Sequence, residues 1–275
     1  MRLVDSHGHL NADRFEQDIE LVVGGARLAG LERVLVPGWN VGSSERALEV
    51  AGRWPWLDAA VGIHPHDAAK VDEAGWAAID AWARDERVVA IGETGLDSDR
   101  MFSPWEAQLE NLRRNLALAL ATGKPAILHC RARAGERDAQ DALVDELRAA
   151  GFDGAPARAA FGGRPPAVIH SFSGPVDYAR TVVAMGLAVS FSGLVFRRGE
   201  EASAEAVALV PVERFLVETD SPFLSPPGAP RGRNEPEYVA ITARWAAERR
   251  GVGENVLGDG LVAAYDATFP RVRPR

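Results

Sequence analysis

The sequence contains one cysteine, few lysines and no long apolar run. Because Cys130 is the single cysteine, no disulfide can form within the chain, which fits a reducing compartment. Apolar stretches such as Val182–Val189 are interrupted by glycine and are much shorter than the roughly 20 residues that cross a bilayer. No secretion signal precedes the first strand-like segment, so we expect a cytoplasmic protein without a membrane span.

Positive charge is also scarce. The 275 residues include 31 Lys and Arg against 39 Asp and Glu, which gives a formal net charge of −8. This balance argues against a general nucleic-acid coat, although it leaves room for a local basic rim. With 47% hydrophobic and 25% charged residues, the composition is typical of a globular protein with a substantial core.

Eight short runs of β-branched and aliphatic residues alternate with helix-like segments. Strands that recur at intervals of roughly 20 to 40 residues between helices pair in parallel through right-handed crossovers. Eight such units close into one TIM-type (β/α)8 barrel, which predicts a single α/β domain over residues 1–275. The runs lie at Arg2–Asp5, Arg33–Val36, Leu57–Val61, Val88–Ile91, Ala126–Leu128, Ala167–Ile169, Leu187–Phe191 and Phe215–Glu218.

The alternative architecture is an open, doubly wound sheet. Such a sheet usually binds a nucleotide through a glycine-rich turn after its first strand, but here the first strand ends in Asp5-Ser-His-Gly-His9. Gly24–Gly25 lie within a helical pattern, and Gly162–Gly163 lie in a segment, Gly151–Pro166, that we expect to be an irregular loop. We therefore assign no phosphate-binding loop.

The clearest helical pattern spans Pro104–Ala121. Ser103 is positioned to cap its amino end, and Pro104 suits the first helical position. Gly123 and Pro125 mark its end.

All six histidines lie at or just past the carboxyl end of a predicted strand. Side chains alternate between the two faces of a strand, so His7 and His9 share one face and Glu93 points inward by the same alternation. On the last strand Glu218 and Asp220 point to one side. Active sites of this fold lie at the carboxyl ends of the strands. The predicted mouth therefore collects His7, His9, His64, His66, Glu93, His129, His170 and Asp220.

Imidazoles and carboxylates that converge in one cavity are costly to desolvate unless positive charge lies among them. A divalent metal ion supplies that charge. A His-x-His pair followed by distant single ligands offers enough donors for two ions that share a bridging carboxylate. The mixed nitrogen and oxygen donors favour Zn, Mn, Fe or Co over Mg. Any one of these histidines could instead be a hydrogen-bonded core residue, and the role of His66 stays open.

Seven short motifs follow the predicted strands: Asp5-Ser-His-Gly-His-Leu10, Gly62-Ile-His-Pro-His66, Gly92-Glu-Thr-Gly-Leu-Asp97, His129-Cys-Arg131, Ile169-His-Ser-Phe-Ser-Gly174, Ser190-Phe-Ser-Gly193 and Glu218-Thr-Asp-Ser-Pro222. In order and spacing they resemble the TatD-type metal-dependent hydrolases, barrel enzymes of the amidohydrolase superfamily. The resemblance covers the chain from Asp5 to Tyr238 and includes the segment 231–236.

The resemblance implies two ligand sets that share a carboxylate: His7, His9, Glu93 and Asp220 for one ion, and Glu93, His129 and His170 for the other. The cofactors would be two divalent ions, Zn, Mn or Mg, with Glu93 as the bridge. Asp220 would accept the proton of the water that the metal activates. His64 would donate a hydrogen bond to a phosphate oxygen of the scissile group.

By the same resemblance the activity is similar to that of DNases that act from the 3′ end of single strands. Nucleic acid would be a substrate rather than a stable partner. We expect Arg131, on the inward face two residues beyond His129, to contact a phosphate, and the alternative for Arg131 is a structural ion pair. The sequence leaves the oligomeric state open, with a monomer as our expectation.

Two other functions remain open. The first is hydrolysis of an ester or amide bond in a small molecule or an aminoacyl-tRNA, which the same metals support because they polarise a carbonyl. The second is a metal-binding barrel without catalysis, against which the intact Asp220 argues. Three segments depart from the family pattern. Ser98-Asp99 follow Asp97 where an aromatic is usual, Ala132-Arg133 follow Arg131 where Asp-Ala is usual, and the closing helix, Ala264–Phe269, lacks the usual Asn.

Four further residues receive simpler interpretations. Cys130 has the opposite parity to His129 and should be a buried, inert thiol. Asn234 fits a helix amino-terminal cap, and Glu218 should orient a ligand from one layer below the mouth. Trp39, just past the second strand, either packs beneath a loop or stacks on a base.

Overall fold

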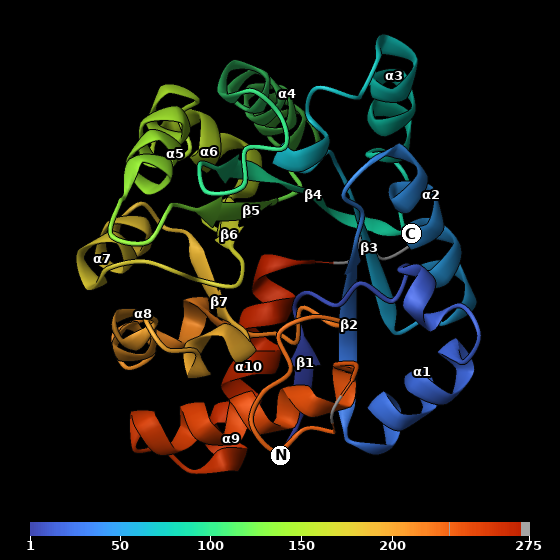
Figure 1. The fold of residues 1–275 in the computed structure, drawn as a ribbon, viewed down its shortest axis with the longest axis vertical. Helices are drawn as coiled ribbons and strands as arrows, with labels where there is room; N and C mark the ends of the chain where they lie inside the picture. Colours follow the sequence, from blue (N-terminus) through green and yellow to red (C-terminus); the bar gives the residue numbers. More distant parts are fainter. Residues whose placement is uncertain (231, 271–275) are drawn as a thin grey trace.

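Eight parallel strands follow one another around a ring in the order of the chain, and helices surround them (Figure 1). The computed structural model describes residues 1–230 and 232–270. Three backbone hydrogen bonds join the end of the first strand to the end of the last and close the ring there: Ser6 N to Val217 O, Asp220 N to His7 O and His9 N to Ser221 O. The predicted TIM-type (β/α)8 barrel is therefore confirmed.

The strands are buried on both faces, as expected for a parallel sheet covered by helices outside and filled by side chains inside. Three of them are longer than predicted. Strand β2 begins two residues before Arg33 and ends one residue after Val36, β4 continues six residues past Ile91, and β5 continues three residues past Leu128. A register shift between Ile91 and Thr94 separates the two halves of β4. The strands are β1 Leu3–Asp5, β2 Leu31–Pro37, β3 Leu57–Val61, β4 Val88–Asp97, β5 Ala126–Arg131, β6 Ala167–Ile169, β7 Ala188–Phe191 and β8 Phe215–Val217.

The helices that connect the strands are α1 Ile19–Leu28, α2 Val41–Arg53, α3 Glu73–Trp82, α4 Trp105–Thr122, α5 Asp138–Ala149, α6 Ala155–Phe161, α7 Val176–Ala184 and α8 Glu201–Ala206. After the last strand come α9 Val239–Arg250 and α10 Glu254–Thr268. Gly123 ends α4 in the left-handed conformation that glycine adopts easily, with φ 64°. Among the described residues, none of the helices has the length and apolar character needed to cross a membrane.

Two local predictions were wrong. Pro104 is the residue before α4 rather than its first residue, and Ser103 does not cap the helix. Instead the Ser103 hydroxyl donates to the carbonyl oxygen of His66 and accepts from the backbone N–H of Ala69. The segment predicted as an irregular loop contains α6, because Pro156 stands in the first helical turn and Gly162 terminates the helix.

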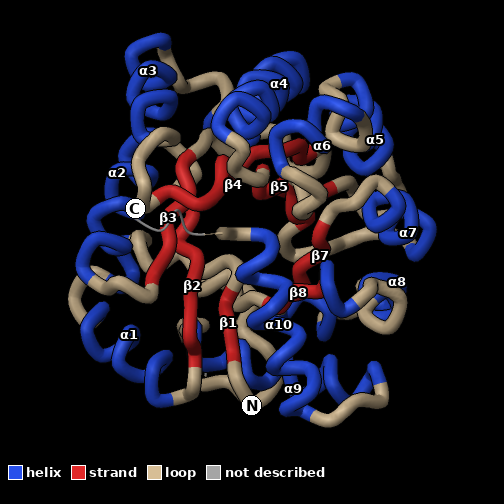
Figure 2. Tube along the Cα trace, turned by 180° about the vertical axis from the view of Figure 1, so that it is seen from behind, coloured by secondary structure: helices blue, strands red, loops and turns tan. Residues whose placement is uncertain are grey.

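Helix α10 covers the barrel end opposite the histidines, and Figure 2 shows it crossing that end of the ring. The Tyr265 hydroxyl donates to Asp58 Oδ2 near the start of β3, at 2.9 Å. Arg33 of β2 lies over the Tyr265 ring, 4.5 Å from its centroid, and donates to Asp58 and to the carbonyl oxygen of Phe269. The amino ends of the strands are thus sealed by one helix and a buried polar network.

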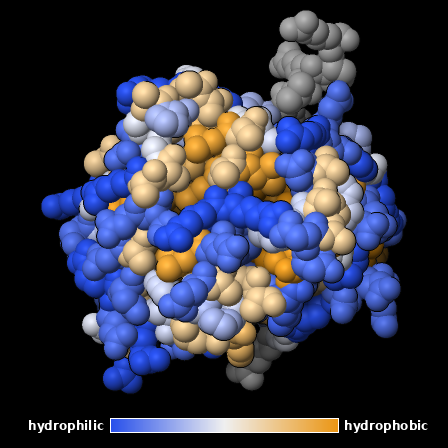
Figure 3. Space-filling view, turned by 90° about the horizontal axis from the view of Figure 1, so that it is seen from above, coloured by the Kyte–Doolittle hydropathy of each residue, from blue (hydrophilic) through white to orange (hydrophobic). Residues whose placement is uncertain are grey.

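A hollow of about 470 Å³ lies outside the barrel, between α3 and α4. Figure 3 shows this side of the molecule, where hydrophilic residues lie across a patch of apolar residues. Its lining includes Trp76, Leu118 and the ion pair between Arg114 and Glu73. The hollow contains none of the histidines, so it is separate from the mouth described below. The prediction of one domain over 1–275 stays a prediction, because residue 231 and residues 271–275 lie outside the described part.

Two helical glycines provide a test of the packing of α10. A Cβ on Gly258 would lie 2.6 Å from the carbonyl oxygen of Arg2, because α10 packs directly on the backbone before β1, whereas a Cβ on Gly24 in α1 would meet nothing within 4 Å. We expect Gly258→Ala to lower the free energy of unfolding by about 1–3 kcal/mol and the melting temperature by several degrees. The control, Gly24→Ala, should raise stability by about 0.5–1 kcal/mol. Thermal denaturation checks both, and equal effects would contradict the described packing.

Candidate metal centre

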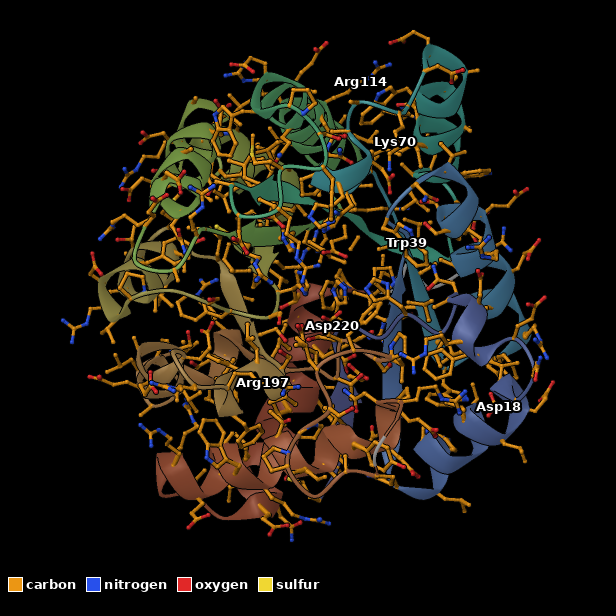
Figure 4. The ribbon with its side chains drawn as sticks, viewed as in Figure 1. Asp18, Trp39, Lys70, Arg114, Arg197 and Asp220 are labelled. Atoms are coloured by element: carbon orange, nitrogen blue, oxygen red, sulfur yellow. The ribbon has the colours of Figure 1, made fainter. Side chains whose placement is uncertain are left out.

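Seven of the predicted site residues come together at the carboxyl ends of the strands. His7 and His9 follow β1, and His64 follows β3; Glu93 and His129 lie within β4 and β5; His170 follows β6 and Asp220 follows β8. We call this cluster the pit: His7, His9, His64, Glu93, His129, His170 and Asp220. Figure 4 shows Asp220 and Trp39 near the middle of the ring, whereas Asp18 and Arg114 lie on its outside. The pit is formed from side chains of six different strands, as the alternation of faces predicts.

Glu93 lies at the centre of the pit and presents one oxygen to each side. Its Oε2 lies 3.4 Å from His7 Nε2 and 3.7 Å from His9 Nε2. Its Oε1 lies 2.9 Å from His170 Nε2 and 3.3 Å from His129 Nδ1. The carboxylate therefore belongs to two groups of donor atoms, one with His7 and His9 and one with His129 and His170.

Asp220 completes the first of these groups. Its Oδ1 lies 3.3 Å from His9 Nε2 and 3.7 Å from His7 Nε2. Its backbone has φ 52°, in the left-handed region that non-glycine residues adopt only where the surroundings enforce it. The enforcing contacts are the bonds that close the barrel, since Asp220 N–H donates to His7 O. The same hydrogen bond thus closes the ring and fixes the position of the Asp220 carboxylate.

Two carboxylates farther from Glu93 hold histidines of the pit in place. Glu218 Oε1 lies 3.2 Å from His170 Nδ1 and accepts from the Ser171 backbone at 2.6 Å, which gives Glu218 the orienting position expected from the sequence. Asp97 Oδ2 lies 3.3 Å from His129 Nε2 and 2.7 Å from His66 Nε2. In both cases the far nitrogen of a pit histidine faces a buried carboxylate, which leaves the near nitrogen directed at Glu93.

The sequence analysis assigned no role to Asp97, although it lies in one of the motifs. It is fully buried, and its other oxygen accepts from the backbone N–H groups of Asp99 and Arg100. Gln108 of α4 fixes its backbone through bonds to both N–H and carbonyl. Residues 93 and 97 share a face if the strand continues to residue 97, so a longer predicted strand would have revealed Asp97. The same contact gives His66 a position beside the pit, behind His129.

The charges in the pit depend strongly on one another. Burial raises the pKa of Glu93, but the positive charge of His170 and the hydrogen bond with His129 contribute to holding that pKa well below its usual range. Burial lowers the pKa of His170, but Glu93 and Glu218 together raise it well above its usual value. Burial lowers the pKa of His64 to about 4, so this imidazole is neutral at pH 7. Positive charge is therefore required among the carboxylates, either from protons or from metal.

The donor atoms fit a divalent metal. Two atoms bound about 2.1 Å from one ion at a tetrahedral angle lie about 3.4 Å apart, which matches the separations around Glu93. His170 Nε2 lies 2.9 Å from Glu93 Oε1, yet it has no hydrogen-bond partner in the described part of the chain. A buried nitrogen and a carboxylate oxygen that lie this close without a hydrogen bond are placed as they would be if both bound one cation. Nitrogen and oxygen donors together suit Zn or Mn.

The remaining sequence predictions have mixed outcomes. Arg131 lies at the exposed rim and donates to Asp99 Oδ2 at 2.8 Å, so the structure shows the ion pair, and contact with a phosphate stays a prediction. Cys130 is buried as predicted, and burial raises the pKa of its thiol to about 12. Trp39 is half-buried and its ring lies edge-on to His9, 5.2 Å between centroids.

The prediction for Asn234 was wrong in its form. The short 3₁₀ turn that follows begins after Glu235, and Asn234 does not cap it. Its buried amide instead donates to the carbonyl oxygens of Thr219 and Phe223, at 2.8 and 2.6 Å. Asn234 therefore fixes the loop that carries Asp220. The neighbouring Arg231 lies outside the described residues.

Comparison with known sequences gives a consistent result. The profile of the family described as TatD related DNase matches residues 4–269. The uncharacterized metal-dependent hydrolase YabD of Bacillus subtilis is 36% identical over 246 residues, which cover 90% of each chain. The 3′-5′ ssDNA/RNA exonuclease TatD of Pectobacterium carotovorum is 35% identical over 257 residues, which cover 91% of this chain and 92% of that protein.

Comparison with solved structures agrees. YJJV, a TatD homolog from Escherichia coli, has a TM-score of 0.84 and 26% identity, with 98% of both chains covered. A TatD family hydrolase from Entamoeba histolytica has a TM-score of 0.85 at 19% identity, which supports the fold.

The contact between Asp97 and His129 predicts an effect on metal binding. Asp97→Asn removes the charge behind His129 and leaves the side chain nearly the same size, so we expect metal affinity to fall by about 10–100-fold. The matched control is Asp99→Asn, two residues along, whose carboxylate pairs with Arg131 at the exposed rim. Competition with a chromophoric chelator measures both. Equal affinities for the two variants would show that Asp97 does not orient His129.

Proposed function

We propose that this chain, which belongs to the TatD related DNase family of metal-dependent hydrolases, is a nuclease that cleaves phosphodiester bonds of single-stranded DNA from the 3′ end. The observation that carries the proposal is Glu93, whose two oxygens face two different sets of donor atoms. A pair of metal ions bridged by a carboxylate suits displacement at phosphorus. The relatives named as ssDNA/RNA exonucleases, at about 35% identity, support this substrate class.

His7, His9, Asp220 and Glu93 Oε2 would hold one ion, and Glu93 Oε1, His129 and His170 the other. Divalent ions there, Zn, Mn or Mg, would lower the pKa of a water and polarise the phosphoryl oxygen. The number and identity of the ions belong to this proposal. So does the cytoplasm as the place of action, with nucleic acid as a substrate rather than a stable partner.

Asp220 is the proposed base. Burial raises its pKa, but the hydrogen bond with His9 and the charges on His7 and His9 lower it more, so Asp220 is ionised and able to accept a proton at pH 7. Its position at the mouth end of the cluster leaves its side chain 14% exposed, so that the attacking water can reach it. Accepting that proton on a carboxylate oxygen would be the contribution of Asp220 to the reaction.

His64 is the proposed hydrogen-bond donor to the substrate. Its Nδ1 accepts from the backbone N–H of His66 at 3.1 Å, so the neutral ring carries its proton on Nε2. That nitrogen points into the pit, 3.2 Å from Glu93 Oε1. The backbone therefore fixes His64 in the tautomer that donates toward the reacting group, where it would bind a phosphate oxygen.

Two observations favour a second function. The chain carries a net charge of −8, and Arg131, the cation expected to contact a phosphate, already pairs with Asp99. A small ester or amide would need fewer phosphate contacts than a DNA strand. A barrel that binds metal without catalysis is less consistent with an ionised Asp220 beside two histidines.

The base role predicts a separation of metal binding from activity. Asp220→Asn leaves Glu93, His129 and His170 intact, so the protein should retain at least one ion by elemental analysis while kcat falls by about 10²–10⁴. Asp259→Asn, on the exposed surface of α10, is the control and should behave like wild type. Full activity of Asp220→Asn would refute the base role.

The substrate class has its own test. Purified protein with Mn or Mg should shorten a 5′-labelled single-stranded oligonucleotide one nucleotide at a time from the 3′ end and should release the label of a 3′-labelled one as a mononucleotide. EDTA should abolish both. The same samples are screened against phosphomonoesters, carboxylic esters and amides. Hydrolysis of an ester or amide without any cleavage of DNA, across several metals, would support the small-molecule function instead.

A further inference from the structure

We infer that Phe102 and Phe223 are two stacking surfaces, one on each side of the pit, that hold the nucleobases flanking the phosphodiester being cleaved. The inference rests on the proposed function, because it assigns to a single-stranded nucleic acid the contacts that position it over the pit. It concerns two residues that lie outside the motifs and that the sequence analysis did not single out.

Both side chains are exposed, and both touch histidines of the mouth. Phe102 is 64% exposed and Phe223 is 54% exposed, although phenyl rings are normally buried. The Phe102 ring lies edge-on to His66 with 4.7 Å between centroids. The Phe223 ring lies edge-on to His9 with 6.2 Å between centroids. Each ring thus lies roughly perpendicular to a histidine of the mouth and has much of its surface in solvent, where a flat ligand can contact it.

The two rings follow strands on opposite sides of the barrel and contact different histidines of the mouth. Phe102 follows β4 and Phe223 follows β8, and these strands are four positions apart in a ring of eight. Figure 2 shows β4 and β8 across the ring from each other. Glu93 and its histidines lie between them. A strand lying across the mouth, with a phosphate over the pit, would therefore direct the base on one side to Phe102 and the base on the other side to Phe223.

The backbone beside each ring is fixed, so neither ring is a loose surface side chain. The Phe223 N–H donates to the carbonyl oxygen of Asp220, and the Phe223 carbonyl oxygen accepts from the Asn234 amide at 2.6 Å. Next to Phe102, Ser103 is fully buried and bonds to His66 O, and its carbonyl oxygen accepts from Gln108. Binding a ligand there would cost little ordering of the protein.

The surrounding charge favours bases over phosphates as the points of contact. Near Phe102 the cations Arg131 and Lys70 are paired with Asp99 and Asp67. With a net charge of −8, the protein offers a long polyanion little general attraction. Stacking on aromatic rings needs no charge and tolerates every base, because each base has a π-face. It therefore suits a single-strand nuclease that lacks a basic coat.

The test compares variants on substrates with and without bases. Phe102→Leu and Phe223→Leu are assayed on a single-stranded oligonucleotide and on two versions that carry a baseless tetrahydrofuran nucleotide, one at the 3′ terminus and one at the penultimate position. We expect each variant to raise KM on the normal strand by about tenfold with kcat nearly unchanged. Each variant should also become insensitive to loss of one base. For one variant this should be the 3′-terminal base, and for the other the penultimate base. Leu28→Ala, a 92% exposed residue at the end of α1, is the control.

The outcomes separate the inference from the proposed function. If wild type cleaves DNA and both Phe variants keep its KM and its response to the baseless strands, stacking is refuted while the nuclease function stands. If wild type cleaves no nucleic acid, the proposed function fails, and stacking is then read from binding alone. For that measurement, Asp220→Asn is titrated into an oligonucleotide with 2-aminopurine near its 3′ end, whose fluorescence falls on stacking. Quenching that disappears in Asp220→Asn with Phe102→Leu supports the inference, and an absence of quenching overturns it.

Discussion

The structure depends on one carboxylate surrounded by imidazoles. Glu93 is almost fully buried, which would be costly for an isolated anion, and it is tolerated because His7, His9, His129 and His170 approach both of its oxygens. Those histidines are fixed in turn by groups farther from the centre, His170 by Glu218 and His129 by Asp97. The pit is therefore a balanced set of charges in which each member needs the others, and metal ions are the natural way to complete the balance.

The alternation of side chains along strands predicted most of this arrangement. The apolar runs and the positions of the histidines were enough to place six predicted metal ligands at one end of a barrel. The alternation of faces is a local rule, and a parallel barrel brings the carboxyl ends of all its strands to the same end. The sequence does not reveal Asp97, because the apolar pattern of β4 ends at Ile91. The strand nevertheless continues through the Gly-Glu-Thr-Gly segment to Asp97. Where an element ends depends on neighbouring strands, and the sequence of one strand does not show this.

Contacts made by loops were the least predictable from sequence. Asn234 has the residue type and spacing of a helix cap, yet its amide bonds to the loop after β8, because β8 ends near it in space. Arg131 has the parity of an inward residue, but at the end of β5 it turns to Asp99. Phe102 and Phe223 give no sequence signal at all, since an apolar residue in a loop is expected to pack. Their exposure becomes visible only when the surfaces of the loops are known.

Helix α10 seals the end of the barrel opposite the pit, where Tyr265 and Arg33 meet Asp58. The interior between α10 and the pit is filled with side chains, so the barrel is open only at the pit and has no channel through it. A polymer cannot be threaded through it. A substrate must therefore reach Glu93 through the mouth, and its products must leave through the same opening. A released fragment has to leave the mouth before the next bond can enter it.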